Sequence, residues 1–531
     1  MTCRPDSPDP YHALPRRFNA AAHFVDRHVA AGRGQRVALV CDGRGITYRE
    51  VHAGVNRVGN ALRRLGVRME DRVPLLLPDG PAFVYAFWGA IKIGAVPVPL
   101  SPLSRAAELQ HVLDDARAAA AIVDDTLVEV IDAARPRLER LRHVVVVGGV
   151  PGNHLSFEEL VAGESAELDP AATTKDDVAF WLYTSGTTGT PKATVHLQHD
   201  MVVCCETYGR AVLDIGPDDR CYSAAKLCFA YGLGNTLYFP FHVGASALLD
   251  GERPAPARIA RLIARERPTL FFAVPTTYGA MLRAAEAGEV EYDLASLRCC
   301  VSAGEPLPRP LYDRWKDRFG VEILDGLGST ELCHIVISNR RGCVRPGSAG
   351  TLVPGYDAKI VDDEGVELPA PEVGHLMVRA ESACAGYWNQ HTRTKQTFVG
   401  DWVRTGDRCF RDGEGVFWYV GRSDDMFKVS GMWVSPNEVE AALLEHAAVA
   451  EAAVVAAPDD DHLAKPLAFV VLAPGQAPTP GLETELKDLT SARLGRRKTP
   501  RWVVVVPELP KAATGKIQRF RLRELAVAAG R

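Results

Sequence analysis

The sequence lacks the features that direct a protein into or across a membrane. Its opening residues, MTCRPDSPDPYHALPRR, contain no apolar core of the signal-peptide type. The most hydrophobic segment, near GPAFVYAFWGAI, is interrupted by Asp79 and Lys92 before it reaches the length of a bilayer span. These absences predict a soluble, cytoplasmic protein without a membrane partner.

The sequence also has no large excess of one charge and no cysteine motif typical of a metal or redox site. The 61 Lys and Arg residues against 66 Asp and Glu give a formal net charge of -5, which offers no field for holding nucleic acid or an acidic membrane. The 12 cysteines include no C-x-x-C motif, so we expect reduced, mostly buried thiols rather than a zinc ribbon or a redox pair. His196 and His199 have no third ligand spaced nearby, which argues against a metal site there.

Length and patterning predict an α/β protein of two domains. The 531 residues exceed the usual size of one domain. Short apolar runs alternate with amphipathic stretches from about residue 36 to 125 and again through LIARERPTLFFAVP, as expected of parallel sheets covered by helices. Between about 340 and 421, short β-like pieces separated by Gly, Pro and Asp-Gly turns predict a small, β-barrel-like sheet. We expect a large domain over 1–423 and a small α+β domain over 424–531.

The stretch YTSGTTGTPK (183–192) combines hydroxyl residues, glycines and one lysine. Backbone N–H groups of a Gly-rich turn can converge on one anion, and the hydroxyls and the Lys192 ammonium add donors and charge. The stretch is not a Walker A loop, because Pro191 stands where the second glycine belongs, and G-x-G-x-x-G is also missing. The pattern indicates a polyphosphate site, although such a cluster by itself is more often a plain surface loop.

Four further motifs follow this loop in order. They are LDGLGSTE (324–331), VRTGD (403–407), GRSDDMFKVSG (421–431) and PKAATGKIQR (510–519). With the loop they resemble the adenylate-forming superfamily of acyl- and aryl-CoA ligases, luciferases and peptide-synthetase adenylation domains, over nearly the whole chain. The resemblance implies two half-reactions: a carboxylate attacks the α-phosphate of ATP with loss of pyrophosphate, and a thiol then displaces AMP.

Three segments narrow the resemblance to the benzoate-CoA ligase branch. They are SAAKLCFAYGLGNTLYFPFHVGA (223–245), GSTELCHIVISNR (328–340) and FKVSGMWVSPNEVE (427–440). The branch implies an aryl carboxylate as substrate, with ATP, Mg²⁺ and coenzyme A, and leaves benzoate, aminobenzoate and hydroxybenzoate open. The residues implied to line a flat, mostly apolar slot are Ala230, Tyr231, Ala303, Gly328, His334 and Ile335. Tyr231 and His334 are expected to offer hydrogen bonds there.

The resemblance also implies which residues hold the nucleotide. The phosphate loop comprises Thr184, Ser185, Gly186, Thr187, Thr188, Gly189 and Lys192. The other nucleotide contacts are Ala303, Gly304, Glu305, Pro306, Asp325, Gly326, Leu327, Gly328 and Ser329, and Leu327 replaces an aromatic residue common in relatives. Thr330 is implied to contact phosphate and Glu331 to bind magnesium. Asp407 is implied to accept the ribose hydroxyls, with Arg422 near the nucleotide.

The C-terminal motifs imply a moving catalytic group. Lys516 matches a lysine whose ammonium reaches the carboxylate and the α-phosphate as charge builds between them. Asp424 matches the hinge about which the small domain rotates between the half-reactions. Lys428, Ser430 and Gly431 follow the hinge, and the last two would face the pantetheine channel, where glycine leaves room for the thiol arm.

Two other readings stay open. The thiol comes from outside the chain, so a carrier protein is an alternative to coenzyme A. The basic residues within 493–498 would meet either acidic partner or form a solvated helix end. A nucleotide sensor without catalysis is the second alternative, against which the intact Lys192, Glu331, Asp407 and Lys516 argue. The sequence leaves monomer and homodimer open.

Overall fold

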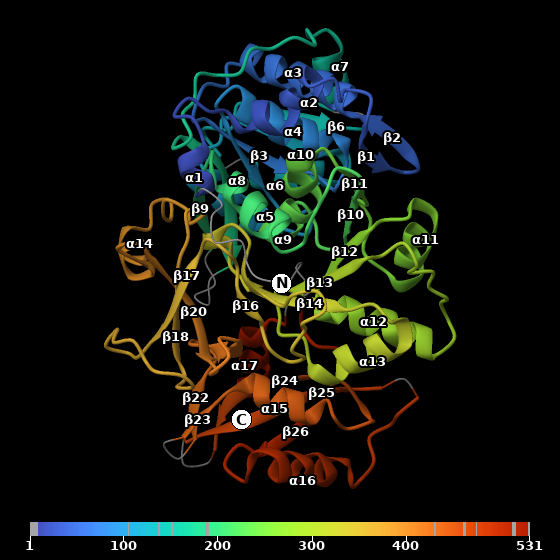
Figure 1. The fold of residues 1–531 in the computed structure, drawn as a ribbon, viewed down its shortest axis with the longest axis vertical. Helices are drawn as coiled ribbons and strands as arrows, with labels where there is room; N and C mark the ends of the chain where they lie inside the picture. The colour runs from blue at the N-terminus through green and yellow to red at the C-terminus, as the bar shows by residue number, and fades with distance from the viewer. Residues whose placement is uncertain are drawn as a thin grey trace.

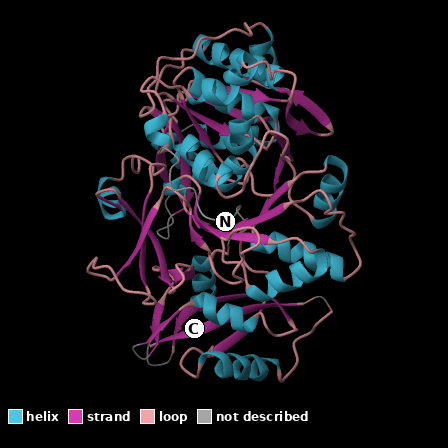
Figure 2. Cartoon of the chain, in the orientation of Figure 1, coloured by secondary structure: helices cyan, strands magenta, loops and turns pink. Residues whose placement is uncertain are grey.

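The computed structural model describes residues 9–104, 106–135, 138–149, 152–185, 191–429, 432–459, 463–473, 475–511 and 517–528. Two large sheets lie in the upper and central part of the molecule, and a smaller C-terminal unit lies below them (Figure 1). Helices and strands alternate along both large sheets (Figure 2). The α/β architecture predicted from the apolar periodicity is confirmed.

The larger sheet has nine strands. In spatial order they are β16 (Thr351–Leu352), β15 (Ile335–Ser338), β14 (Ile323–Gly328), β13 (Cys299–Ala303), β12 (Leu270–Ala273), β10 (Arg220–Ser223), β11 (Ser246–Leu249), β1 (Val37–Cys41) and β2 (Arg44–Thr47). The run from β14 to β1 is parallel, and β15, β16 and β2 are antiparallel additions at its edges. The carboxyl ends of the parallel strands therefore lie at one edge of the sheet.

The second large sheet is fully parallel and has five strands. Its strands are β4 (Val96–Pro99), β3 (Arg72–Leu76), β5 (Ala120–Asp124), β6 (His143–Val147) and β7 (Leu155–Ser156). Alternate residues of a strand face opposite sides, and both sheets use this to build one shared core. Leu270 and Phe272 of β12 join Leu75 of β3 in that core, whereas Phe271 faces the opposite side.

Helices fill the shared core and cover both outer faces. Those in the shared core include α3 (Tyr48–Arg64) and α4 (Pro81–Lys92). The nine-stranded sheet is covered by α11 (Pro256–Glu266), α12 (Pro275–Glu286) and α13 (Arg309–Phe319), and the five-stranded sheet by α5 (Ala106–Asp115) and α6 (Val128–Ala134). Shorter helices are α1 (Pro10–Ala13), α2 (Arg27–Ala30), α7 (Phe157–Ala162), α8 (Asp200–Cys204), α9 (Ala230–Leu233), α10 (Phe239–Val243) and α14 (His391–Thr397). None of the helices in the described ranges has the length and apolar character needed to cross a membrane.

Two smaller β elements carry predicted motifs. The hairpin of β8 (Val178–Ser185) and β9 (Pro191–Leu197) flanks the Gly-rich loop. The small sheet comprises β17 (Asp357–Val361), β18 (Gly374–Arg379), β20 (Trp402–Arg411), β19 (Phe398–Val399) and β21 (Phe417–Arg422). Its strands pair in antiparallel fashion, as the turn-rich sequence predicted.

The C-terminal unit is α+β. It contains the hairpin β22 (Phe427–Val429) and β23 (Met432–Val434), then α15 (Pro436–Leu443), β24 (Val449–Pro458), β25 (Ala464–Leu472), α16 (Leu482–Leu494), β26 (Trp502–Val505) and α17 (Arg519–Ala528). The Ser435 and Glu438 side chains form a capping box at the start of α15. The Ser435 hydroxyl also donates to the Val420 carbonyl of β21, so the cap attaches this unit to the small sheet. The boundary at 423/424 stays a prediction.

The cysteines agree with the expectation of reduced thiols. Among the described cysteines, all of which are free, only Cys41 and Cys343 are not buried. Burial raises the pKa of the Cys228 thiol well above its ordinary value. A thiol held in its neutral form behaves as a small apolar side chain in the core.

Candidate active site

The carboxyl ends of β13 and β14 bring two predicted nucleotide-binding segments together. Ala303 ends β13 and pairs with Gly326 of β14. Gly304 follows with a φ of +94°, a conformation that glycine adopts without strain. The Glu305 carboxylate beyond it accepts a hydrogen bond from the Thr276 hydroxyl at 3.2 Å. Open α/β sheets bind ligands at this edge, so segments 303–306 and 325–329 are well placed for a nucleotide.

Asp325, predicted to contact the nucleotide, has a structural task at this edge. Its carboxylate is buried and accepts the Leu307 backbone N–H at 3.1 Å. Burial raises the pKa of Asp325 to about 7, although hydrogen bonds from Leu307, Ser302 and Gly326 act in the opposite direction. The side chain thus ties the 303–306 loop to β14.

An ion pair joins the Gly-rich hairpin to the Thr330–Glu331 motif. Lys192 on β9 places Nζ 3.0 Å from Oε1 of Glu331, which lies in the 3₁₀ turn η6 (Thr330–Leu332). The Lys192 ammonium also donates to the Tyr387 hydroxyl at 2.6 Å, and that hydroxyl donates to Glu331 Oε1 at 2.7 Å. These three side chains form a closed triangle of polar contacts.

The Glu331 carboxylate is held in its ionised form. Burial acts to raise its pKa, but the Lys192 charge and the hydrogen bonds from Tyr387 and Lys192 outweigh burial and lower the pKa to about 2. An ionised carboxylate is the ligand that Mg²⁺ requires. Sequence analysis did not single out Tyr387, because it lies 195 positions from Lys192 and no local pattern marks it.

The hairpin places the ends of the phosphate loop beside this ion pair. Thr184 and Lys192 are directly opposite each other on β8 and β9, and the backbones of Ser185 and Pro191 pair next to them. Gly186, Thr187, Thr188 and Gly189 lie outside the described residues.

Asp407 and Arg422, the predicted ribose-side residues, are cross-strand partners on β20 and β21. Arg422 Nη1 donates to Asp407 Oδ1 at 3.1 Å and to the Thr405 carbonyl at 2.9 Å. Asp407 is buried, so the nearby guanidinium compensates a carboxylate that would otherwise be costly to bury.

The residues predicted for the aryl slot lie on adjoining elements. Ala230 and Tyr231 begin α9, and Ile335 begins β15 opposite Gly328 of β14. The Tyr231 and His334 rings are 5.6 Å apart. A Cβ at Gly328 would lie 2.2 Å from the His334 carbonyl oxygen, so this close approach of two strands requires glycine.

His334 is a neutral imidazole in this wall. Burial lowers its pKa to about 3, and Nε2 faces two acceptors, the Asn235 amide oxygen at 3.2 Å and the Tyr231 carbonyl at 3.3 Å. Nε2 therefore carries the proton and Nδ1 has a bare lone pair. Among the described residues, buried Nδ1 has no hydrogen-bond partner. Phe239, whose ring centroid lies 4.6 Å from that of His334, also borders it and was not predicted.

The hydrogen bond expected from Tyr231 to a substrate stays a prediction, and the Tyr231 hydroxyl has a partner within the fold. Its hydroxyl donates to the Val301 carbonyl at 2.9 Å, which commits its proton to β13. The ring still contributes an apolar face to the wall.

The predicted C-terminal residues are only partly described. Asp424 lies in the turn after β21, and Lys428 on β22 places Nζ 4.8 Å from the Trp433 ring centroid. Ser430, Gly431 and Lys516 lie outside the described residues. Of the basic residues within 493–498, Arg493 in the last turn of α16 pairs with Glu445, and Lys498 beyond the helix pairs with Glu438, so both have partners within the C-terminal unit.

Comparison with known families covers both parts of the chain. Residues 26–388 match the AMP-binding enzyme family, and residues 438–516 match the AMP-binding enzyme C-terminal domain. The chain belongs to the AMP-binding enzyme family. Its resemblance to the benzoate-CoA ligase branch, predicted from sequence motifs, is confirmed by relatives that align over almost the full length.

Three such relatives of this AMP-binding enzyme are informative. A benzoate–CoA ligase of Thauera aromatica is 45% identical over 96% of each chain. The crystal structure of the anthranilate CoA ligase AuaEII in complex with anthranoyl-AMP is 42% identical and superposes with a TM-score of 0.94, covering 98% of this chain and 99% of that one. A benzoate CoA ligase from Burkholderia xenovorans LB400 is 42% identical, with a TM-score of 0.87 over 95% of this chain and 100% of its own.

The Lys192–Glu331 pair predicts an acid-sensitive contribution to stability. The folded-state pKa of Glu331 is about 2, below its ordinary value of 4.5, so the ionised form stabilises the fold above pH 4.5 and this contribution is lost as the pH falls towards 2. We expect Glu331→Gln to lower the free energy of unfolding by about 1–3 kcal/mol at pH 7 and by much less at pH 3.

Urea unfolding of both proteins at the two pH values measures this difference. Glu364→Gln, which changes an exposed glutamate in the turn after β17, is the matched control and should leave the profile unchanged. The same pH dependence in the Glu331 variant and the parent would contradict the prediction.

Proposed function

We propose that this protein is an ATP-dependent aryl-CoA ligase. It would join a benzoate-type carboxylic acid to coenzyme A through an aryl-adenylate, releasing AMP and pyrophosphate. The observation that carries the proposal is that one short segment contributes both a charged pair and an aromatic wall. Glu331 contacts Lys192, and three residues later His334 lies against Tyr231. An aromatic ring against this wall would direct its carboxylate towards the charged pair. The similarity to benzoate– and anthranilate–CoA ligases supports the same substrate class.

In the first half-reaction, negative charge shifts to the departing pyrophosphate. Lys192, now paired with Glu331, would turn to the β- and γ-phosphates, and Thr184, Ser185 and Thr330 would add hydrogen bonds. Lys516 would neutralise charge between the attacking carboxylate and the α-phosphate. Asp407, whose charge Arg422 balances, would orient the ribose through its hydroxyls.

Glu331 fits a magnesium ligand. Mg²⁺ is usually held by one or two carboxylates together with substrate phosphates. No group of three His, Cys, Asp or Glu side chains forms a metal cage within the part of the chain that is described. When bound, the ion would reduce the negative charge of the phosphates, and Glu331 would be its carboxylate ligand.

The second half-reaction would use the C-terminal unit as a mobile domain of residues 424–531. Two contacts support Asp424 as its hinge. The Ser423 hydroxyl lies 3.1 Å from His375 Nδ1 of β18, and Asp425 accepts a hydrogen bond from Arg523 of α17 at 2.6 Å. Residues on either side of Asp424 are thus attached to different parts of the molecule, which leaves the backbone at 424 to absorb a rotation.

Product analysis tests the proposed function directly. Purified protein with ATP, Mg²⁺ and coenzyme A is expected to convert one of benzoate, aminobenzoates or hydroxybenzoates to its CoA thioester, detected by mass spectrometry, with short fatty acids as controls. Preference for an amino or hydroxy acid would indicate that its donor reaches the bare His334 Nδ1. Accumulation of adenylate alone would point to a carrier-protein thiol, and absence of both products would refute the proposal.

Lys516→Ala is expected to reduce acid-dependent pyrophosphate release by about 100-fold or more, because a cation at the developing charge would be missing. Thioester formation from supplied aryl-adenylate should be retained, since that step no longer involves the α-phosphate attack. Lys511→Ala, which removes a nearby lysine paired with Glu451, is the control for charge loss in the same segment. Equal loss of both half-reactions in the Lys516 variant would contradict its assignment.

Gly431→Trp is expected to spare pyrophosphate release and to block thioester formation, because the indole would fill the path of the pantetheine arm. Rates of the two half-reactions, measured separately, check this expectation. Gly413→Trp is the control, since a Cβ placed there meets no atom within 4 Å. Unchanged thioester output from the Gly431 variant would place the channel elsewhere.

A further inference from the structure

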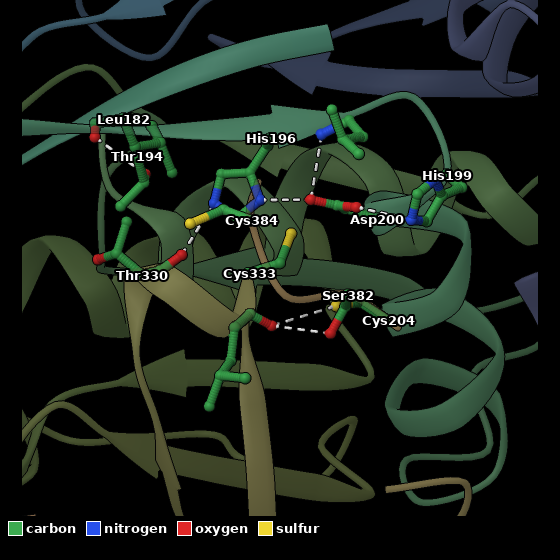
Figure 3. Close-up of polar contacts among 12 residues, drawn as sticks. Leu182, Thr194, His196, His199, Asp200, Cys204, Thr330, Cys333, Ser382 and Cys384 are labelled. Carbon is green, nitrogen blue, oxygen red and sulfur yellow. Dashed lines mark hydrogen bonds and ion pairs between the residues drawn. The ribbon is translucent and has the colours of Figure 1, made fainter. Parts of the chain in front are cut away.

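The η6 turn that carries Thr330 and Glu331 is anchored through its backbone carbonyls. His196 Nε2 donates to the Thr330 carbonyl at 2.8 Å (Figure 3). The Cys384 N–H donates to the Glu331 carbonyl at 2.8 Å, and the Ser382 hydroxyl donates to the Leu332 carbonyl at 3.0 Å. Three successive carbonyls of the turn therefore each have a donor, and His196 supplies the first.

His196 comes from the same strand as Lys192. Residues four apart on a β-strand lie on the same side, so both side chains of β9 face the turn. Lys192 contacts the Glu331 carboxylate, and His196 contacts the carbonyl of Thr330. One strand thus fixes both the charged end and the backbone of the predicted phosphate and magnesium turn.

The His196 ring is itself held on every side. It is buried and stacks on Phe180, with ring centroids 4.8 Å apart and an interplanar angle of 11°. Its Nδ1 lies 2.7 Å from Asp200 Oδ2, and that oxygen also accepts the Leu197 N–H at 3.1 Å. His199 Nε2 lies 3.2 Å from the other oxygen of Asp200. Because a carbonyl only accepts, Nε2 of His196 is the donor to Thr330, and Nδ1 faces the Asp200 carboxylate.

We propose that His196, supported by Asp200, is a positioning residue that fixes the Thr330–Glu331 turn relative to Lys192 for binding of ATP. It does not touch the reacting atoms. A turn that shifts by a fraction of an ångström would misplace the Thr330 hydroxyl and the Glu331 carboxylate together, while the aryl wall beyond it would keep its contacts. The kinetic test of this proposal rests on the proposed function, because it measures acid-dependent exchange. The binding test requires only that the protein binds MgATP.

Two amide substitutions separate the two hydrogen bonds of His196. In His196→Gln the amide nitrogen occupies the place of Nε2 and keeps the donor to Thr330. In His196→Asn it occupies the place of Nδ1 and reaches only Asp200. We expect His196→Asn to raise KM for ATP about 10-fold in acid-dependent ATP–pyrophosphate exchange, with KM for the aryl acid within about 2-fold of the parent. His196→Gln should stay within about 3-fold for both substrates.

His28→Asn is the matched control. His28 is also fully buried and its Nε2 lies 2.5 Å from a backbone carbonyl, that of Phe241, in a different part of the shared core. The control should lower the melting temperature without changing KM for ATP. Equal KM values for the Asn and Gln variants of His196, or equal increases in the KM of ATP and of the acid, would overturn the proposal.

A binding measurement separates this proposal from the proposed function. Calorimetric titration of the full chain with MgATP, without acid, should show a Kd about 10-fold higher for His196→Asn than for His196→Gln even if no aryl acid is turned over. An unchanged Kd in an active enzyme would refute the positioning role and leave the ligase function intact. If circular dichroism shows that the Asn variant does not fold, Ser382→Ala replaces it, because this change removes the hydrogen bond to the Leu332 carbonyl of the same turn. The Kd for MgATP should then rise at least about 3-fold. An unchanged Kd would overturn the proposal.

Discussion

The ion pair between Lys192 and Glu331 determines how the parts of this molecule meet. It connects the β8–β9 hairpin to the turn after β14, which are separate elements of the fold. Both groups are largely buried, and a buried charge without its partner is strongly destabilising. The pair therefore keeps two charges in a buried place that would not tolerate either alone. In the proposed function, the phosphates of ATP would be a new partner for Lys192 and Mg²⁺ a new partner for Glu331.

The sheets explain why this pair is where it is. The shared core between the nine-stranded and five-stranded sheets is filled by α3, α4 and the core-facing residues of both sheets. Polar and charged groups can therefore gather at the strand ends, outside this apolar core. β13 and β14 end beside each other, so the Gly304 turn, the Asp325 carboxylate and the η6 turn are consecutive features of one edge. The antiparallel strand β15 then returns His334 and Ile335 to the same place.

Local sequence signals predicted the elements and the motif residues, but not their partners. Short apolar runs in the sequence were sufficient to predict strands β3, β5 and β12. A strand that is buried on both faces consists mostly of residues such as Val, Ile, Leu and Phe. Tyr387 and Asn235 could not be found this way, since each acts through a contact with a residue about 100 or more positions away. Tyr231 shows the same limit: its type and place suggested a hydrogen bond to substrate, but no local signal indicated that its hydroxyl donates to the Val301 carbonyl.

The proposed function would require both fixed groups around the nucleotide and a catalytic lysine that is carried by a moving unit. Lys192, Glu331 and the His334 wall are held by strands and by buried side chains, so a rotation of the C-terminal unit about residue 424 need not disturb them. In the proposed mechanism, only groups beyond residue 424 would change their distance to the acyl carbon. The Lys516 ammonium would then move away from the α-phosphate after adenylation. The aryl group and the AMP leaving group would stay oriented for attack by the thiol. In the proposed reaction, His196 would hold the η6 turn through the Thr330 carbonyl in both half-reactions, while the groups beyond residue 424 move.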